Sequence, residues 1–413
     1  MNTRAENITP SMLTWARETA GLSVEDAASK LGLNSSAKAT ATEKLEAYER
    51  GDTKPTRNQL LKIASTYRRP LSVFYRLIPP AEGDQGEDFR TLSAAVSDKE
   101  TALFKAILRD IRSRQDMVKS IMEDDEDFRK RSFVGSMPVT SDTVGAVQSI
   151  QQVLGINEYH EFRRKLNSPD KLLSALRQKV EDIGVFVLFV GNLGSHHTNI
   201  SARVFRGIAI ADEIAPFIVI NDQDAVPARS FTLIHELVLL FTGSTGVSNA
   251  PSMVRGETRK TRIERFCNDV ASEFLLPEES LADIQPLSSH EQAAETIRSV
   301  ALGANVSESM TAYRFWRANR IDDGVYRQLV ATYTTRWSSK EAKSNLVDQS
   351  SKPGPSYYTV RRHKLGKALV SLVGRSLKDE NITHTKAALI LGVNPGNVET
   401  LLKGARADSS TVL

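Results

Sequence analysis

The residues best suited to chemistry lie in the run Ser230-Phe-Thr-Leu-Ile-His-Glu-Leu-Val-Leu-Leu-Phe241. Residues four apart share one face of a helix, so the pattern His-Glu-x-x-His lets two imidazoles bind one zinc ion while the glutamate polarises a metal-bound water. His235 and Glu236 fit the first two positions, but Leu239 stands where the second histidine should be. Because leucine has no lone pair to donate, a zinc site at this helix lacks one ligand.

The surroundings of this His-Glu pair distinguish it from two other such dipeptides, at 160–161 and 290–291. A bare His-Glu pair is most often an accident of a surface or a core. The helix predicted at 231–241 is almost wholly apolar, and a buried His and Glu are costly there without partners. A second helix is predicted at 263–276 and carries Glu264. Two neighbouring helices would then present one imidazole and two carboxylates to one cleft.

Other side chains could complete this metal site. His196 and His197 lie in a predicted polar loop, and they would reach the cleft only if the loop folded over it. Cys267 lies three residues after Glu264 on the same side of its helix, where a thiolate would be a good zinc ligand and a packed thiol is the commoner role. Three alternatives follow for Leu239: a natural pseudo-enzyme that senses or docks a partner, a loss-of-function variant of an active peptidase, or rescue by an unforeseen ligand.

The elements that must position these residues are mostly helices around one small sheet. Residues 185–190 and 217–220 form buried-strand runs, and apolar residues alternate over 204–210 as in a half-buried strand. Residues 98–131 alternate apolar and charged side chains at helical spacing, which predicts a long exposed helix. Helical patterns fill the remainder of the chain, so the sequence predicts an α+β, mostly helical multidomain protein.

Residues 10–78 read as short helices with the shape of a helix-turn-helix. One helix ends at Gly21, Ser23 caps the next, and a third is predicted at 42–50. A helix, a tight turn and a second helix is a common DNA-reading arrangement. We expect DNA contacts from Lys38, Thr40, Thr42 and Lys44. Three glutamates in the third helix would repel phosphate, so the alternative is a module for protein contacts or self-association.

The composition limits where the protein works. The chain has 413 residues, and its longest apolar run, 185–190, is far too short to cross a bilayer. Its first residues lack the apolar core of a signal peptide. The single cysteine rules out an internal disulfide framework and fits a reducing compartment. We therefore expect a cytoplasmic protein with no membrane partner.

Positive charge is concentrated at the C-terminal end, although the net charge of the chain is only +4. Residues 353–413 hold nine Lys/Arg against four Asp/Glu. This excess points to an acidic partner such as nucleic acid, or to a solvated helix face. The candidate docking face consists of Arg361, Arg362, Lys364 and Lys367.

Several blocks of the sequence resemble one family of metallopeptidases. Three blocks occur in order: Ala215-Pro-Phe-Ile-Val-Ile-Asn221, Ser230-Phe-Thr-Leu-Ile-His-Glu-Leu237, and Ile263-Glu-Arg-Phe-Cys-Asn268 through Ala271-Ser-Glu-Phe-Leu-Leu-Pro277. They resemble the ImmA/IrrE family. The run Lys44-Leu-Glu-Ala-Tyr-Glu-Arg-Gly51 with Lys54-Pro55 resembles an XRE-type helix-turn-helix, and Asp88-Phe-Arg-Thr-Leu92 and Leu391-Gly-Val-Asn-Pro395 resemble the longer, fused members.

The resemblance implies roles for individual residues. His235 matches the first zinc ligand, Glu264 the third ligand and Glu236 the general base, whereas Leu239 does not match the second ligand. The family cleaves helix-turn-helix repressors. We therefore expect a transcriptional, stress or phage-defence regulator with weakened zinc binding, whose partners are DNA and a repressor or antitoxin protein. The alternative is an active zinc metalloendopeptidase that cleaves such a protein.

The resemblance also implies a division of the chain and a zincin-like central domain. The predicted parts are a helix-turn-helix domain (1–78), a helical connector (79–165), the zinc-peptidase-like domain with its small sheet (166–300), a helical extension (301–345) and a basic helical C-terminal domain (346–413).

Overall fold

The computed structural model describes residues 3–36, 39–80, 97–125, 129–140, 142–194, 198–248, 258–344 and 356–409. Lys38, His196, His197 and the block Asp88–Leu92 lie outside these ranges. The chain divides into two compact units, one made of 1–112 with 192–200 and the other of 113–191 with 201–413. The division falls within helix α5 (Asp98–Glu123). The five domain boundaries expected from the sequence stay predictions.

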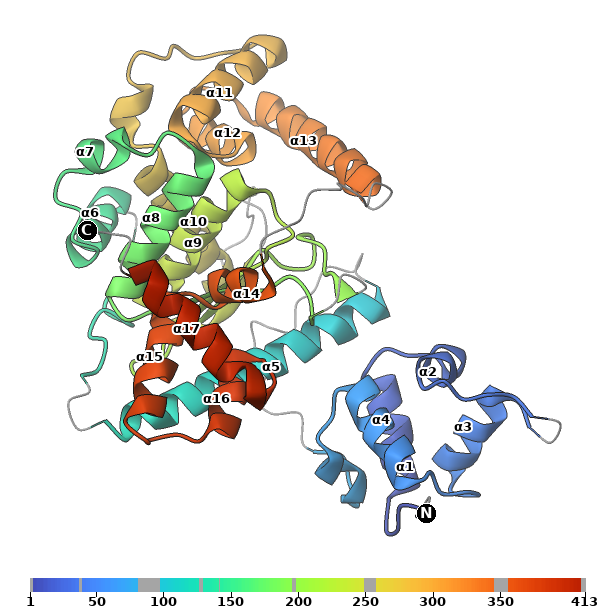
Figure 1. Cartoon of the computed structure of the whole chain (residues 1–413). Coiled ribbons are helices and arrows are strands. Elements are labelled where there is room, and N and C mark those ends of the chain that lie inside the picture. Colours follow the sequence, from blue (N-terminus) through green and yellow to red (C-terminus); the bar gives the residue numbers. More distant parts are fainter. Residues whose placement is uncertain are drawn as a thin grey trace. The chain divides into compact units, whose positions relative to one another are not determined.

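The first unit begins with short helices, drawn in blue in Figure 1. They are α1 (Pro10–Glu18), α2 (Val24–Lys30), α3 (Ala41–Arg50), α4 (Arg57–Tyr67) and the 3-10 helix η1 (Leu71–Tyr75). The predicted start signals operate as expected, because the Ser23 hydroxyl accepts a hydrogen bond from the Asp26 amide at the start of α2. Gly51 ends α3 with a left-handed φ of 83°. The predicted third helix is confirmed to within one residue.

The second unit contains a four-stranded mixed sheet, whose strands are β1 (Phe186–Phe189), β2 (Gly207–Ile210), β3 (Phe217–Ile220) and β4 (Gly246–Ser248). Their order is β1-β3-β2-β4. The first pair is parallel, with Phe186 opposite Phe217, and the other two pairs are antiparallel. The apolar runs at 185–190 and 217–220 are thus confirmed as strands, whereas β4 was not predicted.

The alternating pattern at 204–210 predicted a half-buried strand. The strand is present as β2, but its burial differs from that prediction. Ala209 belongs to the main core, and Ile208 on the opposite face is equally buried. Successive residues of a strand point to opposite faces, so burial of both requires cover on both sides of the sheet. The prediction failed because alternation of residue types reports polarity, whereas burial is set by what packs on each face.

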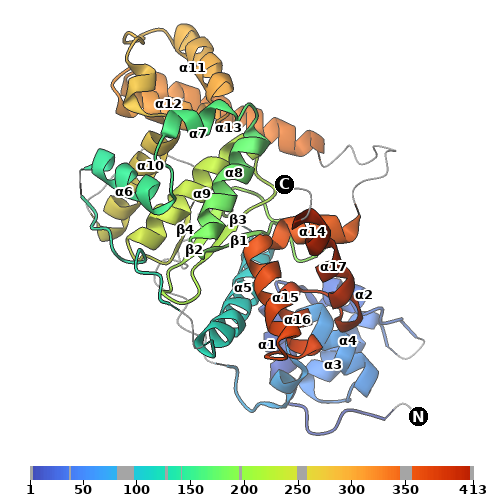
Figure 2. The same cartoon turned by 60° about the vertical axis from the view of Figure 1, so that its left-hand side comes forward.

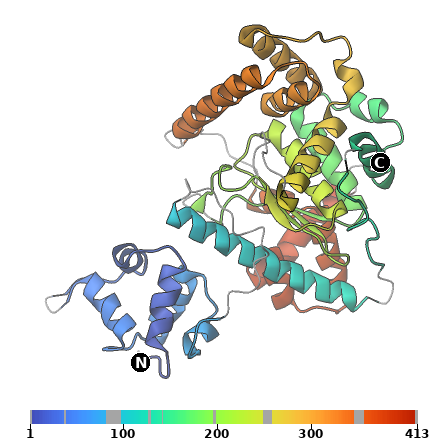
Figure 3. The same cartoon turned by 180° about the vertical axis from the view of Figure 1, so that it is seen from behind.

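Helices surround this sheet. They are α6 (Thr143–Val153), α7 (Tyr159–Arg164), α8 (Pro169–Asp182), α9 (Val226–Phe241), α10 (Arg259–Leu275), η4 (Glu278–Leu281), α11 (His290–Ala304), α12 (Glu308–Arg317), α13 (Asp323–Ser344), α14 (Tyr357–Leu365), α15 (Lys367–Lys378), α16 (His384–Leu391), η5 (Pro395–Asn397) and α17 (Val398–Ser409). Helices α8 and α9 lie side by side against the sheet (Figure 2). Helices α11–α13 and α14–α17 gather at opposite ends of this unit (Figures 1 and 3). The mostly helical α+β fold class is confirmed, and it is consistent with a zincin-like domain.

No helix in the described part of the chain is long and apolar enough to cross a membrane.

Most cations of the expected basic docking face on α14 form bonds within the chain, and the docking role stays a prediction. Arg361 donates two hydrogen bonds to the carbonyl of Leu391, and Lys364 forms an ion pair with Asp222 at 2.7 Å. Arg362 donates to the carbonyl of Leu401. These cations hold the C-terminal helices together and fasten α14 to the loop after β3, so they are engaged within the chain.

A buried ion pair anchors the C-terminal helices to the sheet. Arg177 and Glu181 of α8 lie 3.1 Å apart (Nε to Oε1), and the other oxygen of Glu181 accepts the backbone amide of Lys367, 3.0 Å away, at the start of α15. Gly366 has a φ of +83°, and a Cβ there would collide with Glu181. Burial raises the pKa of Glu181 while Arg177 and the α15 amides oppose that rise. The contact depends on both charges being present.

Replacement of Glu181 by alanine should destabilise this unit by about 3–5 kcal/mol, because it leaves the Arg177 guanidinium buried without its partner. Urea unfolding followed by circular dichroism measures the loss, and limited proteolysis should release the α14–α17 segment more readily. Glu161→Ala, which breaks an exposed ion pair with Arg164, is the control and should cost less than about 1 kcal/mol. Equal losses in both variants would contradict the anchoring role.

Candidate active site

Helix α9 places the His-Glu pair at the centre of the second unit. Pro227 lies in its first turn, where the missing amide hydrogen costs nothing, and every residue from Ser230 to Phe241 is buried. A helix that is apolar on all sides must be covered on all sides, which explains why it is held between α8, α10 and the sheet. His235 and Glu236 are 1% and 0% exposed.

Helix α10 brings the predicted third residue to this pair. His235 Nε2 lies 3.6 Å from Glu264 Oε2, within ion-pair range but beyond a normal hydrogen bond. The Glu264 side chain is 28% exposed, so it lies at the accessible edge of the site. The structure therefore brings together the imidazole and the carboxylate that the sequence placed on neighbouring helices. Their roles as metal ligands stay predictions.

The Glu236 carboxylate is held under strands β2 and β4. Its Oε1 accepts a hydrogen bond from the Ser248 hydroxyl, and its Oε2 has no hydrogen-bond partner among the described residues. Gly207 of β2 lies so close that a Cβ there would collide with this carboxylate. Burial raises the pKa of Glu236 to about 7. Glu236 can therefore exchange a proton near neutral pH, as a general base must, but its catalytic role stays a prediction.

The two neighbouring groups have pKa values that move in opposite directions. Burial alone would lower the pKa of His235, but the carboxylates of Glu264 and Glu236 favour its protonated form, and the net shift is upward. Burial alone would raise the pKa of Glu264, but the charge of His235 outweighs it, and the net shift is downward. Each group of the pair therefore favours the charged form of the other.

Two polar residues of the site were missed by the sequence analysis, Ser248 and Asn268. Asn268 is fully buried one helical turn after Glu264, and both of its side-chain polar atoms lack a hydrogen-bond partner among the described residues. Both nitrogens of His235 are in the same condition. Buried polar groups rarely remain unpaired, so this cluster has the character of a binding site. The spacing of Asn268 from Glu264 was the available signal for it.

The donors present do not fit a three-ligand zinc site. Leu239 lies one turn after His235, is 6% exposed and offers no donor atom. Cys267 is fully buried, and burial raises the pKa of its thiol well above the usual value, so a thiolate is disfavoured. Within the described ranges, no three His, Cys, Asp or Glu side chains are arranged to hold a metal ion. The site thus supplies one imidazole and one carboxylate toward a shared position.

The predicted DNA-contacting residues form the start of α3. The Thr40 hydroxyl accepts the Glu43 amide while the Glu43 carboxylate accepts the Thr40 amide, a reciprocal cap. Thr42 lies 3.0 Å from the Thr40 hydroxyl, and Lys44 Nζ donates to the carbonyl of Asn34. Lys38 lies outside the described residues. These hydroxyls and this ammonium group therefore stabilise the turn before α3; Thr40 is exposed, whereas Thr42 and Lys44 are partly buried.

Replacement of Glu236 by glutamine should stabilise the protein at alkaline pH. The native pKa of about 7 lies above the unfolded value of 4.5, so the native state binds this proton more tightly, and the associated stability is present below pH 4.5 and lost as the pH rises through 7. Glutamine avoids that loss, so the free energy of unfolding should rise by about 3 kcal/mol at pH 8 and change little at pH 4. Urea titrations at both pH values measure the difference. An equal change in the free energy of unfolding at pH 4 and pH 8 would show that the pKa of Glu236 is not raised in the folded state.

Comparison with known families places this site in a recognised domain. Residues 186–315 match the family model of the peptidase M78 group, described as the IrrE N-terminal-like domain. The match spans strand β1 through most of α12, and so includes His235, Glu236 and Glu264. No curated protein and no solved structure matches the chain. The chain therefore contains an IrrE N-terminal-like domain at residues 186–315, and this domain carries the candidate active site.

Proposed function

We propose that this protein is a regulator whose IrrE-like domain binds a partner protein and has weakened or lost zinc peptidase chemistry. The observation that carries the proposal is Leu239, which occupies the α9 position one turn after His235. A catalytic zinc site takes three protein ligands and keeps one position open. With His235 and Glu264 alone, metal affinity falls steeply and the fold remains available as a sensor or docking surface.

The charges of the site support this proposal. In a metal site the cation balances the surrounding carboxylates. Here the raised pKa of His235, due to Glu264 and Glu236, favours an imidazolium that supplies positive charge at the same place. The lowered pKa of Glu264 keeps its carboxylate ionised as the partner of that imidazolium. The site can thus remain folded without a metal ion.

An active zinc metalloendopeptidase that cleaves a repressor or antitoxin is the second candidate. It is favoured by the unpaired polar atoms of His235, Glu236 and Asn268, which lie together in a buried site. It is also favoured by the family match, because this family is typically zinc-dependent. The two candidates differ in one measurable property, which is the zinc content of the purified chain.

Restoration of the missing donor tests the proposal. Leu239→His places a second imidazole four residues after His235, on the same face of α9. The wild-type chain should purify without stoichiometric zinc, and the variant should bind zinc because three donors then converge. Elemental analysis by mass spectrometry measures the metal content.

Leu239→Asn is the matched control for this substitution, since it introduces polarity of similar size without a zinc-binding nitrogen, and it should remain metal-free. Stoichiometric zinc in the wild-type chain would refute the proposal and support the active peptidase. Absence of zinc from a folded Leu239→His variant would show that the cleft was not a metal site.

DNA is the second partner that we propose, through α2, the following turn and α3. Two of the three glutamates of α3 form contacts within the fold. Glu49 forms a largely buried ion pair with Arg17 at 2.7 Å, and Glu43 caps the helix. Phosphate repulsion by this helix is therefore weaker than its sequence suggests.

The single cysteine supports a proposal about the cellular compartment. Cys267 is free and buried, which fits a reducing compartment, and we propose the cytoplasm.

Thr42→Glu should abolish DNA binding by the first unit, because it adds a negative charge at the start of α3, where phosphate is expected. Gel shift at low salt with the promoter region of the protein's own gene measures the effect, and wild-type binding should weaken as salt is raised. Ser65→Glu places the same charge on an exposed position of α4 and should bind as the wild type does. Absence of wild-type binding at low salt would remove DNA from the proposal.

A further inference from the structure

A groove runs along helix α10 on the outside of the IrrE-like domain. Two adjoining hollows of about 610 and 370 Å³ share Val139 and Arg262 among their lining residues. One wall is formed by residues 137–140 with Thr143 and Val144, and the other is α10 from Arg259 onward. We call it the α10 groove. Its lining includes Ile263 and Arg265, which flank Glu264 in the sequence of α10.

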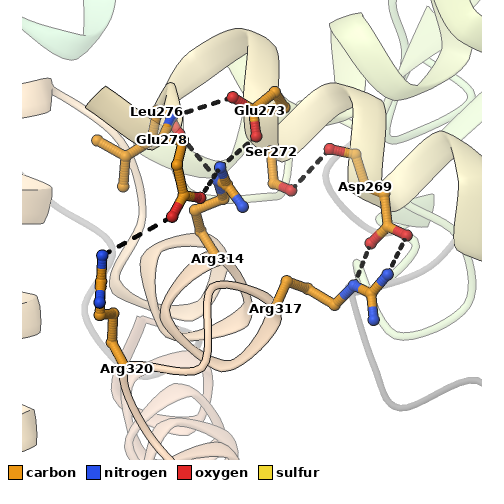
Figure 4. Close-up of polar contacts among 8 residues, drawn as sticks. All are labelled: Asp269, Ser272, Glu273, Leu276, Glu278, Arg314, Arg317 and Arg320. Atoms are coloured by element: carbon orange, nitrogen blue, oxygen red, sulfur yellow. Dashed lines mark hydrogen bonds and ion pairs between the residues drawn. The ribbon is translucent and has the colours of Figure 1, made fainter. Parts of the chain in front are cut away.

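At the C-terminal end of the α10 groove the charges are neutralised by ion pairs. Arg317 forms two hydrogen bonds of 2.6 Å with Asp269. Arg314 pairs with Glu273 and with Glu278, as Figure 4 shows. Each acid at this end therefore faces an arginine of α12. This part of the groove offers no unbalanced charge to a ligand.

At the N-terminal end the charges are not balanced in this way. The side chains of Arg259 and Arg262 make no ion pair or hydrogen bond with any residue that the structure describes, and both residues are exposed. The first turn of α10 contains no acidic residue. Because a helix N-terminus carries a partial positive charge, cations there destabilise the helix and acids would be favoured. The arrangement is unfavourable for folding alone and creates a local positive field.

The facing wall of the α10 groove is apolar. Val139 and Val144 are 40% and 55% exposed, and Met137 and Ile263 are partly buried beside them. Exposed valines beside unpaired arginines form a surface that complements side chains of two kinds, acidic and aliphatic. Such a combination is typical of a peptide-binding surface with apolar anchors and charged contacts at the rim.

We propose that the α10 groove docks an acidic segment of a partner protein. Aspartate or glutamate side chains of that segment pair with Arg259 and Arg262, and an aliphatic side chain packs against Val139 and Val144. This inference rests on the proposed function, since it names the class of partner that the IrrE-like domain receives. A nucleic acid fits less well, because the apolar wall with Val139 and Val144 would bind none of its phosphates.

A short fluorescent peptide in which glutamate alternates with valine tests the proposal on the full-length protein. Fluorescence anisotropy should show micromolar binding that weakens as salt is added, since exposed charges are screened. The double variant Arg259→Glu, Arg262→Glu should bind at least about tenfold more weakly, which corresponds to about 1.4 kcal/mol. Arg298→Glu, Lys378→Glu makes the same change in net charge on α11 and α15, and it should bind as the wild type does.

Three results would overturn the proposal: no binding of the peptide at low salt, equal loss in both double variants, or equally tight binding of a lysine–valine peptide. An oligonucleotide bears on the groove only if the Arg259→Glu, Arg262→Glu variant loses its binding, and that loss would favour a nucleic acid as the occupant. None of these results bears on the zinc content of the Leu239→His variant. Failure of the groove and failure of the proposed function are therefore distinguishable. Circular dichroism of each double variant should match the wild type, and the control variant shows whether the charge change alone matters.

Discussion

The structure of the second unit depends on placing one imidazole and one carboxylate in an apolar interior, with a second carboxylate at its accessible edge. Burial of a charge is costly unless an opposite charge or a hydrogen bond compensates it. His235 and Glu264 compensate each other across two helices, and Glu236 receives the Ser248 hydroxyl from the edge strand β4. Gly207 leaves the space into which the Glu236 carboxylate fits. The sheet, α9 and α10 must therefore assemble together for any of these groups to be satisfied.

Under the proposed function, this interior determines how the lack of a metal ligand at Leu239 could be tolerated. A zinc site without one ligand would leave two acids and one neutral imidazole in a dry environment, which is electrostatically unfavourable. Protonation of His235 removes much of that cost, because the imidazolium attracts both carboxylates. Within the described part of the chain, Asn268 and His235 retain polar atoms without a hydrogen-bond partner, and these atoms mark the position where the compensation is incomplete. A water molecule or a polar group of a partner protein at that position could form hydrogen bonds with these atoms.

Much of this fold could be predicted from residue patterns, and the parts that could not have identifiable physical reasons. Apolar runs long enough to identify the element from the sequence occur in the helix at 231–241 and in the strands at 185–190 and 217–220. Strand β4 has three residues, which is too short for any period, so Ser248 was missed with it. Arg361 and Lys364 were expected on a surface, yet they bond inward, because charge counts do not tell whether acceptors lie nearby. His235 and Glu264 could be paired because both lie on predicted helices, whereas their distance required the tertiary fold.

The central claim is that a protonated His235 takes the place of a metal ion beside Glu264. It is tested most directly by nitrogen NMR of selectively labelled histidine in the wild-type protein, with zinc added in equimolar amount. The Glu264→Gln variant, which removes the partner charge, assigns the signal. We expect both ring nitrogens of His235 to report an imidazolium at neutral pH and to stay unchanged by zinc. A neutral imidazole whose nitrogen signal shifts on zinc addition, with tight saturation, would contradict the account.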